Sequence, residues 1–297
     1  MAIFELMFSP TGGTKKVSAM FAKGLKKAMT ATTAKAISQE SVVIDLLKRD
    51  KDYSACAFSA KDICIVSVPS YGGRVPETAV SRLSQMKGNG ARAILLVVYG
   101  NRDYDDTFAE LQDTLEAAGF VCAAGIAAIA EHSIMHQFAT GRPDQEDEEQ
   151  LKGFAETIWK KLEKQTNTEK TICEELEKQT NTAETDDREE ARMPGSSSAG
   201  LVLPGNRPYR KYDGVPMKPQ AGKTCTRCGI CAKECPAGAI PADNPSKTNT
   251  ESCISCMRCI AVCPEHARSV SKALLAAGSV ILKKSCSVRK KNTLFLT

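Results

Sequence analysis

Eight of the 13 cysteines in this 297-residue chain lie between residues 225 and 263, in two runs with the same spacing. Both runs read C-x2-C-x2-C-x3-C and are followed by a proline. The first run contains Cys225, Cys228, Cys231 and Cys235, and the second contains Cys253, Cys256, Cys259 and Cys263. The chain has no apparent export signal, so we expect a compartment that keeps thiols reduced. Closely spaced thiols there indicate metal ligation rather than disulfides. The fold of this region must therefore be built around bound metal.

The spacing distinguishes between two kinds of metal site. Three cysteines at x2 spacing can wrap around three irons of a [4Fe-4S] cubane, while the fourth, before the proline, turns toward the other cluster. Zinc sites also use C-x2-C motifs, but as separated pairs rather than unbroken runs of four, so the pattern favours iron–sulfur clusters. We predict two [4Fe-4S] clusters with crossed ligation. One is held by Cys225, Cys228, Cys231 and Cys263, and the other by Cys253, Cys256, Cys259 and Cys235.

The segment from about residue 222 to residue 269 resembles the bacterial two-cluster ferredoxins. The resemblance rests on both cysteine runs, on the sequence CPAGAI at residues 235–240, and on the 17 residues, 236–252, between the runs. It implies a small α+β domain, covering residues 205–297, that carries single electrons at low potential.

The start of the chain and its longest apolar run bear on the compartment. Residues 1–8 have no basic side chain ahead of their apolar stretch, so the start lacks the charged region of a secretory signal. The longest apolar run, residues 117–130, has 14 residues, fewer than the roughly 20 that span a bilayer. We expect a cytoplasmic protein with no membrane span.

Positive charge is concentrated toward the C-terminal end. Residues 193–297 contain 16 basic and 5 acidic side chains, a net charge of +11. Basic segments can bind nucleic acid through its phosphates. However, each oxidised cluster with four thiolates carries roughly −2, which offsets much of the excess. We therefore expect no nucleic-acid partner.

The N-terminal part alternates short apolar runs with amphipathic stretches. The runs at residues 2–8, 41–46, 62–68, 91–99 and 121–129 are typical of strands buried on both faces of a parallel sheet. Helices are predicted at about 17–28, 76–86 and 105–118, with a closing helix up to Leu162, whereas residues 47–61 show no helical stripe. This order predicts a doubly wound α/β domain with a five-stranded parallel sheet over residues 1–162.

Residues 163–204 are expected to form a polar linker. The sequence LEKQTNT occurs in it twice, at residues 162–168 and 176–182, with too few apolar residues for a coiled coil. Serine, glycine and proline continue the polar stretch from residue 194.

A loop with the sequence SPTGGT, residues 9–14, joins the first predicted strand to the first helix. Backbone N–H groups at a helix N-terminus form an anion site, and neither the P-loop nor the dinucleotide glycine pattern is present. The loop resembles the flavodoxin phosphate loop, S/T-x-T-G-x-T. That resemblance implies that the phosphate of FMN is bound by Ser9, Thr11, Gly12, Gly13 and Thr14.

Two further loops follow the third and fourth predicted strands, at the edge of the sheet where parallel folds bind ligands. In flavodoxins such loops surround the isoalloxazine ring, so the resemblance implies that Tyr71 or Tyr99 stacks on the ring. The alternative is that the glycines form turns and the tyrosines cover the core. The ring contacts implied are Ser70, Tyr71, Gly72, Gly73, Tyr99, Gly100 and Asn101.

The whole chain resembles the flavodoxin–ferredoxin fusion proteins of anaerobic bacteria, including residues 141–144 and 208–212. This implies an electron-transfer protein that uses two [4Fe-4S] clusters and FMN and serves redox partner proteins. Two alternatives stay open: a flavin-dependent reductase with His132, Tyr71 or Tyr104 as proton donor, and a redox sensor without FMN. For Arg142 we expect an ion pair that caps a helix. The oligomeric state is not set by the sequence.

Overall fold

The computed structural model describes residues 1–32, 40–180 and 200–296. Its main sheet contains the five predicted parallel strands in the order β2-β1-β3-β4-β5. Their bounds are β1 (Ile3–Met7), β2 (Val42–Asp45), β3 (Ile63–Pro69), β4 (Arg92–Tyr99) and β5 (Val121–Ile129). This strand order is that of the flavodoxin-like doubly wound folds. The predicted fold class is therefore confirmed.

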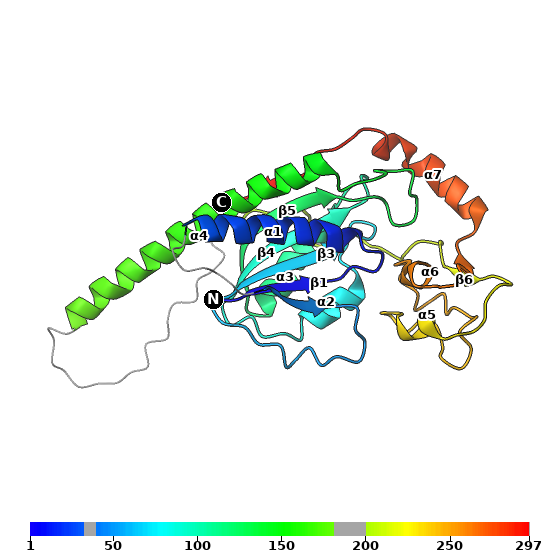
Figure 1. Cartoon of the computed structure of the whole chain (residues 1–297), viewed down its shortest axis with the longest axis horizontal. Helices are drawn as coiled ribbons and strands as arrows, with labels where there is room; N and C mark the ends of the chain where they lie inside the picture. Colours follow the sequence, from blue (N-terminus) through cyan, green and yellow to red (C-terminus); the bar gives the residue numbers. More distant parts are fainter. Residues whose placement is uncertain (33–39, 181–199, 297) are drawn as a thin grey trace.

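Helices cover both faces of the sheet (Figure 1). On one face, α1 (Gly13–Thr32) packs on β3, and α4 (Gln145–Thr180) packs on α1 and β5; their apolar residues form one core with Ile63 and Ile65. On the other, α2 (Glu77–Leu83) and α3 (Thr107–Ala117) pack against the alternate residues Cys64 and Val66. Because successive strand residues point to opposite faces, a continuous apolar strand needs a helix layer on each side.

The sheet has a sixth strand that we did not predict. β8 (Thr293–Phe295) pairs antiparallel with β5, although it lies at the far end of the range expected for the ferredoxin domain. Leu201 and Leu203, expected in the linker, are also buried in the core on the α2 and α3 side. Both ends of the C-terminal part are thus anchored on the flavodoxin-like body.

The predicted linker begins as helix, because α4 continues to Thr180. Glutamate, lysine and glutamine are good helix formers even without an apolar stripe, which explains why the polar repeat is helical as far as it is described. Residues 181–199, which hold the end of the repeat and most of the expected flexible stretch, lie outside the described residues.

The cysteine-rich part is a small α+β unit. It contains a two-stranded antiparallel sheet of β6 (Gln220–Ala221) and β7 (Arg268–Ser269), and the short helices α5 (Ile230–Lys233) and α6 (Arg258–Ala261). Helix α7 (Lys272–Cys286) follows and leads the chain back to the main sheet.

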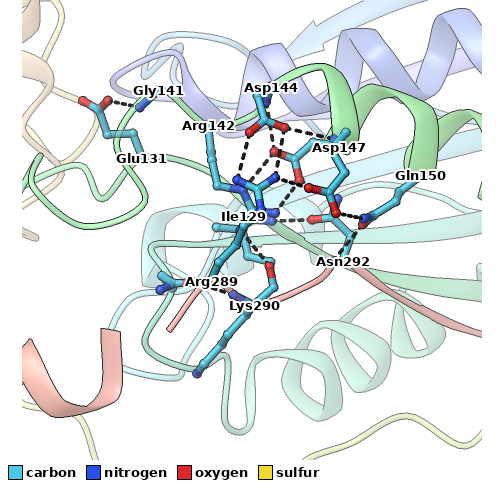
Figure 2. A network of polar contacts seen from close by, with 12 residues as sticks. Ile129, Glu131, Gly141, Arg142, Asp144, Asp147, Gln150, Arg289, Lys290 and Asn292 are labelled. Carbon is cyan, nitrogen blue, oxygen red and sulfur yellow. Dashed lines mark hydrogen bonds and ion pairs between the residues drawn. The ribbon is translucent and has the colours of Figure 1, made fainter. Parts of the chain in front are cut away.

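A buried polar network holds the returning C-terminal segment (Figure 2). The Arg142 guanidinium forms an ion pair with Asp147 at the start of α4, with side chains only 3% and 1% exposed. Asn292 donates from Nδ2 to Asp147 and accepts at Oδ1 from the backbone N–H of Ile129, both at 2.9 Å. The ion pair expected for Arg142 is confirmed, and it also positions β8.

We expect Arg142→Met to lower the free energy of unfolding by about 3–5 kcal/mol, because it leaves the buried Asp147 carboxylate without its cation. Arg289→Met is the matched control, since Arg289 pairs with Asp144 and Glu146 at a site 45% exposed and should cost no more than about 1 kcal/mol. Anaerobic urea unfolding followed by circular dichroism measures both. Equal losses in the two variants would contradict the prediction.

Candidate iron–sulfur centres and phosphate loop

The two cysteine runs have the same backbone conformation. Arg227 and Gly229 in the first run have φ of 57° and 79°, and Ser255 and Met257, at the corresponding positions of the second, have φ of 54° and 61°. Left-handed residues between the cysteines bend the chain repeatedly in one direction. Each run thus forms a loop that turns its first three cysteines toward one centre, and the third of them lies in a short helix.

The structure groups the eight cysteines into two cavities. The first cavity is lined by Cys225, Cys228, Cys231 and Cys263. The second is lined by Cys235, Cys253, Cys256 and Cys259. These are the sets that crossed ligation predicts, with the fourth cysteine of each run in the other run's cavity. Each cavity has an empty volume of about 330 Å3, which includes space open to solvent.

The cavities offer hydrogen bonds to sulfur. The backbone N–H of Ala239 donates to Cys235 Sγ, and that of Ala267 donates to Cys263 Sγ, both at 3.3 Å. Such N–H groups help set the potential of a cluster. Among the described residues no three His, Cys, Asp or Glu side chains converge to bind a single metal ion; the thiols line a larger space instead.

Burial strongly disfavours the thiolate forms in the second cavity. It raises the pKa of Cys256 to about 12 and that of Cys259 to about 11. Without positive charge in the cavity these thiols are therefore protonated at neutral pH, and iron must displace the protons. The residues fit an iron–sulfur cluster that supplies the compensating charge.

The second cavity lies against the flavodoxin-like body. Arg258, between Cys256 and Cys259, donates from Nη1 to the Pro10 carbonyl of the phosphate loop at 3.3 Å. In the opposite direction, Arg82 of α2 donates to the Pro236 carbonyl at 2.7 Å. The first cavity instead has an exposed edge at Cys228. One centre therefore faces the sheet domain and the other faces solvent.

The phosphate loop has the geometry of an anion site. Gly12 has a φ of 95°, which favours glycine, and a Cβ built there meets no atom within 4 Å. The Ser9 hydroxyl accepts the backbone N–H of Lys15 at 2.8 Å. Within the described part of the chain, the backbone N–H groups of residues 11–14 have no hydrogen-bond partner. These N–H groups lie just before and at the start of the 20-residue helix α1, whose dipole favours negative charge at this end. The loop fits a phosphate group.

The loop after β3 lies beside the second cavity. Tyr71 and Arg74 exchange backbone hydrogen bonds, with Gly72 and Gly73 at positive φ between them. Burial raises the pKa of the Tyr71 hydroxyl well above its usual range, and the neighbouring Cys256 and Tyr212 add to the rise. Tyr71 therefore lies beside Cys256, which lines the second cavity.

Several residues that were predicted to contact the flavin ring instead contact other parts of the protein. Tyr99 is 6% exposed and packs on Tyr104, with ring centroids 5.3 Å apart. Asn101 is buried and donates to the carbonyls of Cys286 and Val288. The Ser70 hydroxyl bonds that of Thr107, and Gly100 packs on His132. Of the two tyrosines, only Tyr71 stays a candidate for stacking.

Tyr212 was missed by the sequence reasoning as a site residue. Its ring lies so close to Gly72 that a Cβ built there would be 2.1 Å from Tyr212 Cε2. The backbone carbonyl of the neighbouring Arg210 accepts a hydrogen bond of 2.7 Å from Arg74 Nη1. The only signal was the segment 208–212, which shares the resemblance to fusion proteins but contains no cofactor motif.

His132 has a structural role here. Its Nδ1 accepts the backbone N–H groups of Ile134 and Met135, both at 3.2 Å. Burial is the main reason that its pKa falls from 6.5 to about 4. It is therefore a neutral imidazole at neutral pH rather than the charged imidazolium that is the stronger proton donor.

The His132 ring should titrate near pH 4 rather than near 6.5. The stability it contributes is then present above pH 6.5 and lost as the pH falls toward 4, because the unfolded state binds the proton first. NMR of the ring nitrogens, assigned with the variant His132→Gln, measures this. A midpoint near 6.5 would show that the ring is solvated.

Comparison with known proteins adds independent information on the cysteine-rich part. Residues 224–268 match the family of 4Fe-4S dicluster domains, over the stretch that forms both cavities. The chain therefore joins a flavodoxin-like sheet domain to a segment that matches a 4Fe-4S dicluster domain. It is accordingly an iron–sulfur electron-transfer protein. A comparison with curated proteins found no significant match.

Solved structures similar to the N-terminal half of the chain include several flavodoxins. That of Streptococcus pneumoniae TIGR4 is 19% identical and covers 54% of this chain and 97% of its own, with a TM-score of 0.36. An archaeal flavodoxin is 14% identical and covers 55% of this chain and 99% of its own, with a TM-score of 0.34. Two-electron reduced Megasphaera elsdenii flavodoxin is 14% identical and covers 53% of this chain and 98% of its own, with a TM-score of 0.33. In the described part of the chain no helix is long and apolar enough to cross a bilayer.

Proposed function

We propose that the protein holds two [4Fe-4S] clusters and one FMN and passes electrons between them. The observation that carries this proposal is the position of the second cavity, whose lining residue Arg258 contacts the phosphate loop at Pro10. The cluster ligands are the two sets of four that line the cavities. The phosphate loop and Tyr71 hold the FMN.

The two clusters then have different tasks. The cluster held by Cys235, Cys253, Cys256 and Cys259 lies beside Tyr71 and exchanges electrons with the flavin. The cluster at Cys228 has an exposed edge and serves redox partner proteins. FMN supplies conversion between one-electron and two-electron transfer. The chain's contribution is to hold these groups close together and keep one centre away from water.

Neither alternative reading gains support from the site. A flavin-dependent reductase requires a proton donor over the ring. His132 and Tyr104 are both engaged in structural contacts, and this proposal assigns Tyr71, the third candidate, to stacking on the ring. A sensor without FMN would not need the free N–H groups of residues 11–14.

Anaerobic analysis of the purified protein tests the proposal. We expect about eight irons and eight acid-labile sulfides per chain, because eight cysteines satisfy two cubanes, together with one FMN. The visible spectrum should show both the cluster absorption and the flavin bands. Stoichiometric zinc without iron would refute the clusters, and failure to take up added FMN would refute the flavin.

A further inference from the structure

Helix α7 presents an apolar face to solvent. Val280 and Ile281 are each 77% exposed, and Leu274 is 36% exposed. Ala273 and Ala277 are exposed on the same side, because residues three, four and seven apart share a helix face. We call these five residues the α7 face. Adjacent exposed aliphatic side chains of this size are typical of interaction surfaces.

The opposite side of α7 is packed on the protein. Leu275 and Leu282 contact a cluster that contains Met135 and Met217. Gly278 is buried there so closely that a Cβ built on it would be 2.4 Å from Met135 Cε. The helix is therefore held with the α7 face outward, and Figure 1 shows it at the outer edge of the molecule.

The charged residues of the segment that contains this face are all positive. Residues 267–297 contain seven basic side chains and no acidic one. Arg268, Arg289 and Lys290 bind groups within the protein. The other four are exposed or lie at the exposed end of α7 and form no ion pair among the described residues. These are Lys272, Lys283, Lys284 and Lys291.

We propose that the α7 face binds the surface of an anionic lipid membrane. The aliphatic side chains enter the headgroup boundary, and the lysines meet the lipid phosphates. A second copy packed face to face is a poor occupant, because it would bring the same lysines together and residues 267–297 hold no acidic residue to pair them. A bilayer surface also deforms to fit, so a convex edge helix reaches it along its whole length without a matching groove. The proposal uses none of the cofactor assignments.

Cosedimentation with vesicles tests this on the full-length, cluster-loaded protein. Vesicles of one part phosphatidylglycerol to two parts phosphatidylcholine should bind it, vesicles of phosphatidylcholine alone much less, and added salt should weaken binding. The variant Val280→Ser/Ile281→Ser should lower partitioning at least about tenfold. Lys283→Gln/Lys284→Gln should lower it about tenfold at low salt and less at high salt.

The matched control is Val42→Ser/Val202→Ser, which removes two other exposed valines, 50% and 85% exposed, outside α7. It should bind vesicles as the wild type does, and all variants should keep the visible spectrum and thermal midpoint. Equal binding to neutral vesicles, or no loss in the Val280 and Ile281 variant, overturns the proposal. So does a dimer in analytical ultracentrifugation that this variant abolishes. Equally strong, face-dependent binding to poly-glutamate would assign the face to an acidic protein and overturn it too.

Discussion

Cys235→Ser is expected to remove the cluster of the second cavity and leave the cluster of the first, although Cys235 belongs to the first run. Its thiol lines the cavity of Cys253, Cys256 and Cys259, and loss of one of four thiolates disrupts a cubane. Iron should fall from about eight to about four per chain. In the reduced protein, the EPR signal of two interacting clusters should simplify to that of one.

Two double variants decide which cluster is lost. Under crossed ligation, Cys235→Ser/Cys256→Ser damages one cluster twice and keeps about four irons, whereas Cys235→Ser/Cys228→Ser damages both and keeps almost none. If each run bound its own cluster, the two results would be exchanged. Since each double variant lacks two thiols, a general loss of folding would affect them alike and cannot imitate the difference.

Gly12→Val is expected to abolish FMN retention and leave both clusters in place. The φ of 95° at Gly12 is a conformation that β-branched residues rarely adopt, so valine forces the loop to change. The backbone N–H groups of residues 11–14 then no longer point at one phosphate. Flavin content after anaerobic desalting, with iron content as the internal reference, measures the effect.

Gly141→Val is the matched control for strain. Gly141 also has a positive φ, 76°, and open space at its Cβ position, but it lies in the loop before α4. It should destabilise the fold comparably while FMN stays bound. Equal flavin loss in the two variants would show that the effect is general.

Thr14→Ala tests phosphate recognition within the same loop. Loss of a hydrogen bond to a charged group costs about 1.5–3 kcal/mol, so FMN affinity should fall roughly 10- to 150-fold. Riboflavin, which lacks the phosphate, should respond much less. Titration calorimetry or fluorescence quenching measures both ligands, and an equal response would show that the loop does not recognise phosphate.

The sequence by itself determined those features that depend on short-range spacing. Apolar runs between amphipathic stretches specify five parallel strands with helices on both faces, because each pattern reports which sides of an element are buried. The C-x2-C-x2-C-x3-C spacing indicates clusters for the same reason: the ligands of one loop are set by a few consecutive backbone angles. The loop of residues 9–14 is equally local, since it joins one strand to the next helix.

Only the tertiary structure decided which distant segments meet. β8 is three residues long, too short for any pattern, and exists because the edge of β5 and the buried Asp147 accept it. Tyr99 and Asn101 follow a predicted strand, as Tyr71 does. However, Asn101 is hydrogen-bonded to the C-terminal segment and Tyr99 is buried in the core. The contact of Arg258 with Pro10 joins residues 248 positions apart. Such contacts depend on how the surfaces of two folded parts of the chain fit together, and local spacing and periodicity do not encode that fit.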